Sequence, residues 1–295
     1  MIERSAENDT DRRRFLKSAG LAGLGTLGVG AFGGLDSASA TEGPSDVAIL
    51  NFALNLEYLE GEFYSYAVSG HGLPDYLTTG KGDRDPVIGG RQVHFATPYI
   101  RRYAAEIAQD EERHVKFLRS ALGSAKVARP KIDIKNSFTA AARAAGLIGP
   151  YQTFDPYANE NNFLLAAFIF EDVGVTAYKG AAPLIDNKTY LEAAAGILAV
   201  EAYHAATIRT SLYEKGLQAA ANKISAARDS LDGTSDDDQG IGSDEYANIT
   251  PTNSAGIAFS RTAAHVLNVV YLTPEERRGG GFFPEGVNGS INTSG

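Results

Sequence analysis

Apolar residues recur at helical spacing in four long segments of this 295-residue chain, at residues 46–68, 98–122, 161–181 and 188–216. Apolar positions three and four residues apart predict helices that bury one face. Thr97 and Asn187 stand where N-caps are expected, and Gly123 and Gly216 follow two of the ends. The pattern therefore predicts four long helices, while strand signals are weak throughout the chain.

The connections between these helices indicate how they pair. Residues 69–96, between the first two helices, read as a loop rich in Gly, Pro and Asp. Residues 124–160 form a long connection with three prolines and one short helix near 137–146. We interpret the chain as two helical hairpins joined by this crossover. Four helices with one long crossover predict an all-α, ferritin-like four-helix bundle at 46–216.

Residues 217–295 are expected to form a C-terminal extension of mixed character. A helical piece is predicted at 218–231, and a short fifth helix at 255–271. Between them an acidic, Gly- and Ser-rich stretch that includes Asp236, Asp237 and Asp238 is interpreted as a mobile, solvated surface loop. A cation site at these aspartates is the less favoured alternative. The Gly-rich tail at 279–295 is expected to be irregular.

The first forty residues have the pattern of an export signal. A charged start with Arg12, Arg13 and Arg14 precedes a short, Gly-rich apolar stretch and an Ala38-Ser39-Ala40 end. The Arg-Arg-x-Phe-Leu-Lys run resembles a twin-arginine signal, which predicts export to a periplasmic, extracellular or cell-surface location. An uncleaved membrane anchor is the alternative. After cleavage we expect no stable membrane insertion, because no later segment is apolar over the roughly 20 residues that a span needs.

Composition narrows the chemistry further. The chain carries 27 Lys and Arg against 36 Asp and Glu, a formal net charge of −9, which argues against nucleic acid as a partner. No cysteine is present, which excludes disulfides, iron–sulfur clusters and thiolate zinc sites. Any bound metal must therefore be held by His and carboxylate, and these ligands favour iron, manganese or zinc.

Two Glu-x-x-His motifs lie on the second and fourth helices: Glu111 with His114, and Glu201 with His204. Residues three apart share a helix face, so each motif aims a carboxylate and an imidazole at one point. All four residues occupy positions where the helical repeat demands apolar core residues. Because burying an unpaired carboxylate costs several kcal/mol, such residues need a positive partner. A pair of divalent metal ions meets that need, and a neighbouring arginine is the alternative.

The first and third helices complete the pattern. Glu57 precedes Tyr64 by seven residues, and Glu171 precedes Tyr178 by seven residues, so the two hairpins look like an internal repeat. A Glu from each of two helices plus Glu-x-x-His from each of the other two is the ligand set of ferritin-like dinuclear sites. Glu60 is the alternative to Glu57 on nearly the same face. The two tyrosines are either hydrogen-bond partners of ligating carboxylates or plain core aromatics.

The sequence also resembles a known family. LNFALNLEYLEGEFY, EIAQDEERHVKFL, FIFEDVGVTAYKGAAPLI and ILAVEAYHAATIR look like the four helices of an exported ferritin-like domain family that includes desiccation-related proteins of bacteria, fungi and resurrection plants. The tail GGFFPEGVNG also looks like a family feature. The resemblance implies a ferritin-like bundle and a role in stress tolerance, and it leaves the activity open.

Three functional hypotheses follow. The first is a dinuclear oxidase, peroxidase or catalase that holds two iron or manganese ions and takes O2 or peroxide as substrate. The second is a non-catalytic, desiccation-protective protein in which metal stabilises the core. The third and least favoured is iron storage in a hollow shell. The sequence leaves homo-oligomer formation open.

Overall fold

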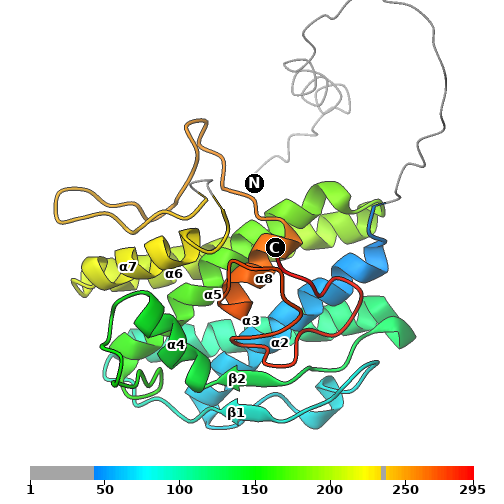
Figure 1. Cartoon of the computed structure of the whole chain (residues 1–295), viewed down its shortest axis with the longest axis horizontal. Helices are drawn as coiled ribbons and strands as arrows, with labels where there is room; N and C mark the ends of the chain where they lie inside the picture. The colour runs from blue at the N-terminus through cyan, green and yellow to red at the C-terminus, as the bar shows by residue number, and fades with distance from the viewer. Residues whose placement is uncertain (1–42, 234–236) are drawn as a thin grey trace, which may run out of the picture. The chain divides into compact units, whose positions relative to one another are not determined.

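Within residues 43–233 and 237–295, the part of the chain that the computed structural model describes, four long helices form the centre of the fold (Figure 1). They are α2 (Asp46–Ser69), α3 (Pro98–Leu122), α5 (Glu160–Ala181) and α6 (Lys188–Glu214). Each boundary lies within two residues of the prediction. The proposed signal segment at 1–40 lies outside the described residues.

Local chemistry explains most of the helix ends. Ser45, Asn159 and Asn187 accept hydrogen bonds from backbone N–H groups in the first turns of α2, α5 and α6. Gly70 ends α2 in the left-handed region, with φ 79°, where glycine pays no side-chain penalty. Thr97 differs from the prediction, because its side chain does not cap α3. Its hydroxyl instead donates to Glu160 Oε1 at 2.6 Å and ties the start of α3 to the start of α5.

The four helices pack as two hairpins. α2 lies along α3, α5 lies along α6, and α2 also contacts α5. α3 and α6 are linked by side chains, as where the Tyr103 hydroxyl donates to Ser211 Oγ at 3.0 Å. The interior between the helices is filled by apolar and aromatic side chains, among them Tyr58, Phe63 and Phe168. This arrangement confirms the predicted ferritin-like bundle with one long crossover.

The crossover contains structure that the sequence pattern did not predict. Strands β1 (Val87–Gly89) and β2 (Ile132–Ile134) form a parallel pair, with Val87 opposite Ile132. The pair was missed because three residues are too few to show an alternating pattern. The predicted short helix is present as α4 (Asn136–Ala144). Three 3-10 turns are also seen within the described residues: η1 (Asp75–Leu77), η2 (Gly123–Ala125) and η3 (Ala182–Leu184).

The C-terminal extension packs against the bundle, and residues 43–295 form one compact unit. It contains α7 (Gln218–Asp229) and α8 (Ala263–Tyr271). α8 begins eight residues later than the prediction, because Thr262 caps it by accepting from His265 N. The tail is irregular, as expected, yet Phe282 is fully buried. The Phe282 ring lies 5.0 Å from Phe138 and 4.8 Å from Phe170, so the tail completes the core.

Six buried side chains form an Arg–Asp cluster that joins the extension to α5 and α6. They are Asp172, Arg209, Arg228, Asp232, Asp238 and Arg261. Asp172 Oδ2 lies 2.7 Å from Arg209 Nη1 and 2.8 Å from Arg228 Nη2. Asp238 lies 2.8 Å from Arg228 Nε and 2.9 Å from Arg261 Nη2. The prediction of a solvated loop is therefore wrong for Asp238, which is buried because two arginines neutralise its charge.

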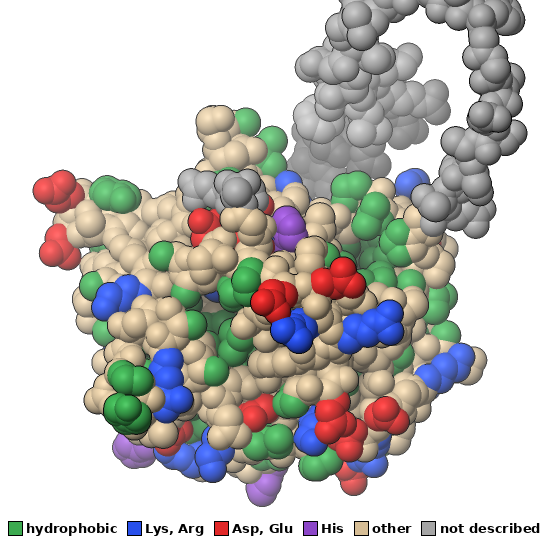
Figure 2. Space-filling view, viewed as in Figure 1, with side chains coloured by type: hydrophobic (Ala, Val, Ile, Leu, Met, Phe, Trp, Pro, Cys, Tyr) green, Lys and Arg blue, Asp and Glu red, His purple; other side chains and the backbone are tan. Residues whose placement is uncertain are grey.

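The surface shows no concentration of one charge on the face seen in Figure 2, where positive and negative side chains are interspersed. None of the helices in the described ranges combines the length and the hydropathy needed to cross a bilayer.

Candidate metal centre

The six residues predicted from the sequence lie together in the interior of the bundle. Their donor atoms form two groups that share Glu201, and every member is buried. The first group consists of Glu57, Glu111, His114 and Glu201. The second consists of Glu171, Glu201 and His204. All four long helices contribute, because the helical repeat turns these positions inward.

The first group converges on one nitrogen. His114 Nδ1 lies 3.2 Å from Glu57 Oε2, 3.4 Å from Glu201 Oε1 and 3.6 Å from Glu111 Oε2. Three carboxylates from three helices thus surround a single imidazole nitrogen. This spacing is that of donors arranged around a small common volume.

The histidine of the second group, His204 on α6, contacts one carboxylate of each group. His204 Nδ1 lies 3.1 Å from Glu111 Oε1 of the first group and 3.7 Å from Glu171 Oε2 of the second. Glu111 therefore directs one oxygen toward each histidine. The other ring nitrogen, His204 Nε2, lies 3.5 Å from Asp110 Oδ2. Asp110, which accepts from Arg113 at 2.8 Å, therefore adds a further negative charge beside this ring.

The two tyrosines cross between the hairpins. The Tyr64 hydroxyl on α2 donates to Glu171 Oε1 on α5, and the Tyr178 hydroxyl on α5 donates to Glu57 Oε1 on α2. Each bond fixes one oxygen of a carboxylate and leaves the other facing the centre. Both tyrosines are buried, and burial raises their pKa well above the ordinary value. Of the two interpretations offered for Tyr64 and Tyr178, the structure shows the hydrogen-bonded one.

Glu60 also lies at the centre, although it belongs to neither group. Its side chain is 6% exposed, and its Oε2 has no hydrogen-bond partner. Burial raises the pKa of Glu60 well above its ordinary value, and the negative charges of Glu201 and Glu111 raise it further. The geometry thus brings Glu57 next to His114 and leaves Glu60 as an additional carboxyl group on α2.

Burial and charge act on the protonation of the centre in opposite directions. Burial raises the pKa of Glu57 to about 8, although His114 opposes this. Burial would lower the pKa of His204, but contacts with Glu111 and Glu171 outweigh it and raise that pKa to about 10. Burial would raise the pKa of Glu111, yet its contacts with His114 and His204 hold it well below its usual range. The imidazoles and the carboxylates of the centre therefore stabilise each other's charged forms.

The donor atoms also test whether a metal fits the site. Seven buried atoms of the centre lack a hydrogen-bond partner: Glu60 Oε2, Glu111 Oε1 and Oε2, Glu171 Oε2, Glu201 Oε1 and Oε2, and His204 Nδ1. Buried polar atoms are normally satisfied, and each unsatisfied one costs about 1–3 kcal/mol. A cation bound between them would satisfy these atoms together. Hard oxygen donors and imidazoles are the ligands that iron and manganese take in proteins, so the donor set fits such ions.

Comparison with known proteins gives the same picture. Residues 45–214 match the ferritin-like domain family over more than half of the chain. The chain belongs to the ferritin-like domain family. It is similar to the desiccation-related protein PCC13-62 of Craterostigma plantagineum, with 37% identity over 199 residues, 63% of this chain and 62% of that protein. The chain thus matches less than two thirds of that relative's length.

A second relative of this ferritin-like chain is the ferritin-like catalase Nec2 of Nesocodon mauritianus. It is 29% identical over 269 residues, which cover 84% of this chain and 85% of that protein. Because it covers 84% of this chain, this similarity extends beyond the bundle. No solved structure matches the chain.

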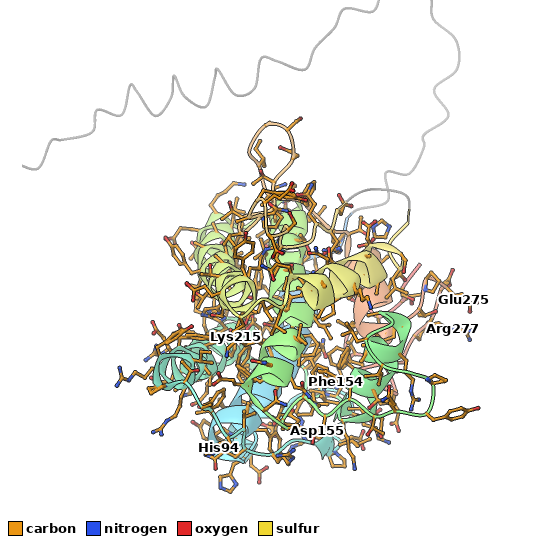
Figure 3. All side chains as sticks on the ribbon, turned by 90° about the vertical axis from the view of Figure 1, so that its left-hand side faces the viewer. His94, Phe154, Asp155, Lys215, Glu275 and Arg277 are labelled. Carbon is orange, nitrogen blue, oxygen red and sulfur yellow. The ribbon has the colours of Figure 1, made fainter. Side chains whose placement is uncertain are left out.

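The other histidines lie away from the centre. His71 and His94 are exposed, and Figure 3 shows His94 at the edge of the molecule. His265 on α8 is half-buried. Sequence reasoning missed Asp110. It also treated Glu60 as an alternative to Glu57, whereas both glutamates lie at the centre. Asp110 was detectable, since it stands one turn before His114 and beside Glu111 on α3.

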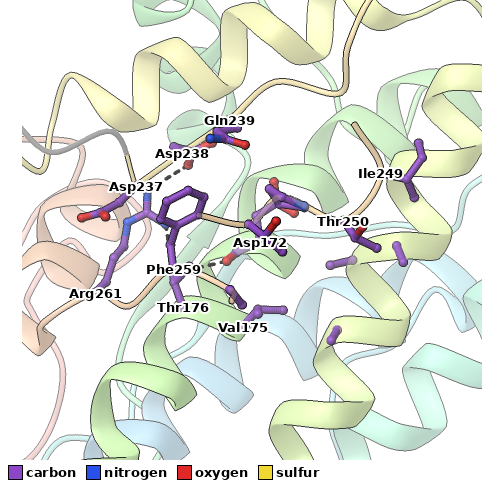
Figure 4. A pocket seen from close by; sticks show the side chains of 16 residues that line it. Asp172, Val175, Thr176, Asp237, Asp238, Gln239, Ile249, Thr250, Phe259 and Arg261 are labelled. Atoms are coloured by element: carbon purple, nitrogen blue, oxygen red, sulfur yellow. Dashed lines mark hydrogen bonds and ion pairs between the residues drawn. The ribbon is translucent and has the colours of Figure 1, made fainter. Parts of the chain in front are cut away.

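A cavity of about 130 Å³ lies between α5, α6 and residues 237–261 (Figure 4). Arg261, Asp238 and Asp172 lie along its wall, and Ala202 and Ala205 line it from α6. Asp172, Ala202 and Ala205 each directly follow a member of the centre in the chain. The cavity therefore borders the same turns of α5 and α6 that carry Glu171, Glu201 and His204.

Proposed function

We propose that this protein is an exported, ferritin-like metalloprotein that binds two iron or manganese ions and consumes hydrogen peroxide. The observation that carries this proposal is the set of seven unsatisfied donor atoms in one buried centre. The similarity to a ferritin-like catalase over most of the chain supports the choice of substrate. The twin-arginine pattern of residues 11–17 supports export after folding, with the metal in place.

The proposed reaction is disproportionation, in which two molecules of hydrogen peroxide give two of water and one of O2. One peroxide is reduced and the other is oxidised, so no external electron donor is required. This balance suits a chain without cysteine, which lacks a thiol relay to a reductase. A bound pair of iron or manganese ions would supply the electrons and take them back within one cycle.

The protein's own groups have three tasks in this proposal. Glu57, Glu111, His114, Glu171, Glu201 and His204 would hold the two ions. Tyr64 and Tyr178 would keep Glu171 and Glu57 in orientation through the hydrogen bonds described above. The apolar core around the centre excludes bulk water and so strengthens each electrostatic contact inside.

Peroxide turnover tests this proposal. The purified protein, loaded with iron or manganese, is expected to release O2 from hydrogen peroxide at a rate far above that of the free ions. Glu111→Gln should abolish the activity, because Glu111 contacts both histidines. Glu112→Gln is the matched control, since Glu112 is the exposed-side neighbour paired with Lys116. Equal turnover by both variants, or none by loaded wild-type protein, would contradict the proposal.

A second candidate function is non-catalytic protection during drying, with the metal stabilising the core. The higher identity to a desiccation-related protein favours it. In this case metal raises the melting temperature and no peroxide is consumed. Measuring both quantities on one preparation separates the two functions.

A further inference from the structure

The two hairpins differ at one position that faces the centre. Glu57 and Tyr64 on α2 are equivalent to Glu171 and Tyr178 on α5 in the internal repeat. Three residues after each glutamate, α2 carries Glu60 whereas α5 carries Gly174. At equivalent positions of the repeat, α2 thus has the largest acidic side chain and α5 has the smallest residue.

Gly174 leaves room for carboxylates. A β-carbon at this position would lie 2.6 Å from Glu201 Oε2 and 3.5 Å from Glu60 Oε1. The first of these distances is shorter than real β-carbon contacts, so any side chain at Gly174 would displace the Glu201 carboxylate. The glycine is therefore matched to Glu60 and Glu201, which share the space beside it.

A purely structural role does not explain why Glu60 is buried. Its side chain is more than nine-tenths buried, and its Oε2 finds no hydrogen-bond donor. The acidic groups that act on it are those of the centre, Glu57, Glu111, Glu171 and Glu201. The other buried glutamate on this helix, Glu62, differs, because it pairs with Arg129 and accepts from Leu73 N at 3.1 Å. A carboxyl group without such a partner, under the influence of four other acidic groups, is one that a cation would satisfy.

We propose that Glu60 is a seventh ligand residue of the metal centre, in addition to the six predicted from the sequence. In this role it shifts the selectivity of the centre toward manganese or iron and away from zinc. This inference rests on the proposed dinuclear centre. Zinc in proteins is satisfied by about four ligands, whereas manganese and iron accept more and manganese favours carboxylate. Glu60 supplies a fifth carboxylate to a centre that already has four carboxylates and two imidazoles.

Metal competition with the full-length mature chain tests this inference. The protein is loaded with manganese or with zinc, and each affinity is measured against a chelator together with the number of ions bound. Glu60→Gln should lose about ten- to a hundred-fold in manganese affinity. Its zinc affinity should change by much less, so the manganese-to-zinc ratio falls. Glu112→Gln on the outside of α3 should leave both affinities unchanged.

A second variant keeps Glu60 and crowds the space that it shares with Glu201. Because a β-carbon at Gly174 meets Glu201 Oε2 first, Gly174→Ala should lower the affinity for manganese and for zinc alike, whereas Glu60→Gln lowers mainly the manganese affinity. The metal-free Gly174→Ala variant should keep wild-type helix content by circular dichroism. X-ray absorption of the manganese-loaded wild type should show more light-atom ligands than that of Glu60→Gln.

The outcomes separate the two proposals. If wild-type protein binds two ions and Glu60→Gln keeps the wild-type manganese-to-zinc ratio, the role of Glu60 is wrong and the dinuclear centre stands. If wild-type protein binds neither metal, both proposals fall.

Discussion

The candidate metal centre and the Arg–Asp cluster are both buried and ionic, yet they differ in the balance of positive and negative groups. In the Arg–Asp cluster three arginines face three aspartates, and every member takes part in an ion pair within 2.9 Å. In the candidate metal centre five carboxylates face two imidazoles, and seven buried atoms lack a hydrogen-bond partner. The charges of the first cluster balance, and its ion pairs hold the extension in place. The second cluster carries excess negative charge, which added positive charge would balance.

The largest expected effect tests the Arg–Asp cluster. Arg261→Met leaves Asp232 and Asp238 without a guanidinium that both contact. Breaking a buried pair from one side costs about 3–5 kcal/mol of unfolding free energy. Chemical denaturation of the metal-free variant measures the loss. Arg277→Met removes an exposed pair with Glu275 and should cost less than about 1 kcal/mol. Similar losses in the two variants would contradict the importance of the buried cluster.

Removing a charge from the candidate metal centre should have the opposite effect on metal-free stability. Glu201→Gln removes one of five crowded carboxylates, so the metal-free variant should be at least as stable as wild type. Wild-type protein at a metal concentration about a thousand times its dissociation constant should gain about 4 kcal/mol, and the variant should lose most of that gain. Thermal melting with and without manganese measures both quantities. A variant that loses metal-free stability and keeps the metal effect would show that the centre is structural.

The pH dependence follows from the shifted pKa values. Glu57 and His204 have raised pKa values of about 8 and about 10, so the metal-free fold binds more protons than the unfolded chain. The metal-free protein should therefore lose stability as pH rises from 4.5 to about 8 through Glu57, and from 6.5 to about 10 through His204.

Metal competes with these protons, so metal-dependent stabilisation should grow between pH 6 and 8, by about 1.4 kcal/mol per pH unit for each proton released. Metal should leave as the pH is lowered toward about 5. Melting curves and metal content across this range measure both trends, and a metal effect that shrinks as pH rises would contradict the proposed ligands.

The smallest expected effect concerns the tyrosines. Tyr178→Phe removes the hydrogen bond to Glu57 and keeps the ring in the core. Loss of such a partner typically weakens metal binding about ten- to a hundred-fold. Tyr103→Phe is the control, because its hydroxyl bonds Ser211 away from the centre. Chelator competition should separate the two variants, and equal affinities would assign Tyr178 to packing alone.

The comparison also explains what sequence reasoning recovered. The positions of Glu111, His114, Glu201 and His204 follow from the helical repeat, because a polar residue in an apolar stripe must lie in the core. The internal repeat then identified Glu57 and Glu171. These inferences need only the local periodicity of the chain, which can be read from a single sequence.

The Arg–Asp cluster was not predictable in the same way. Asp232 and Asp238 lie in a segment without a repeat, and Arg261 precedes α8 in an irregular stretch. Their pairing depends on how the extension folds back onto α5. An acidic, Gly-rich stretch favours a solvated loop by composition, and only the tertiary contacts reverse that expectation. The role of Gly174 is likewise invisible in sequence, since it depends on the distance to Glu201 across α5 and α6.

Metal analysis of the purified mature protein tests the central claim most directly. The protein is loaded with iron or manganese under reducing conditions, freed of unbound ions, and analysed for metal per chain. The unsatisfied donors of the buried centre predict two ions per chain, and Glu111→Gln should reduce that number while Glu112→Gln keeps it. Fewer than one ion per chain in the wild-type protein would contradict the claim that this centre binds metal.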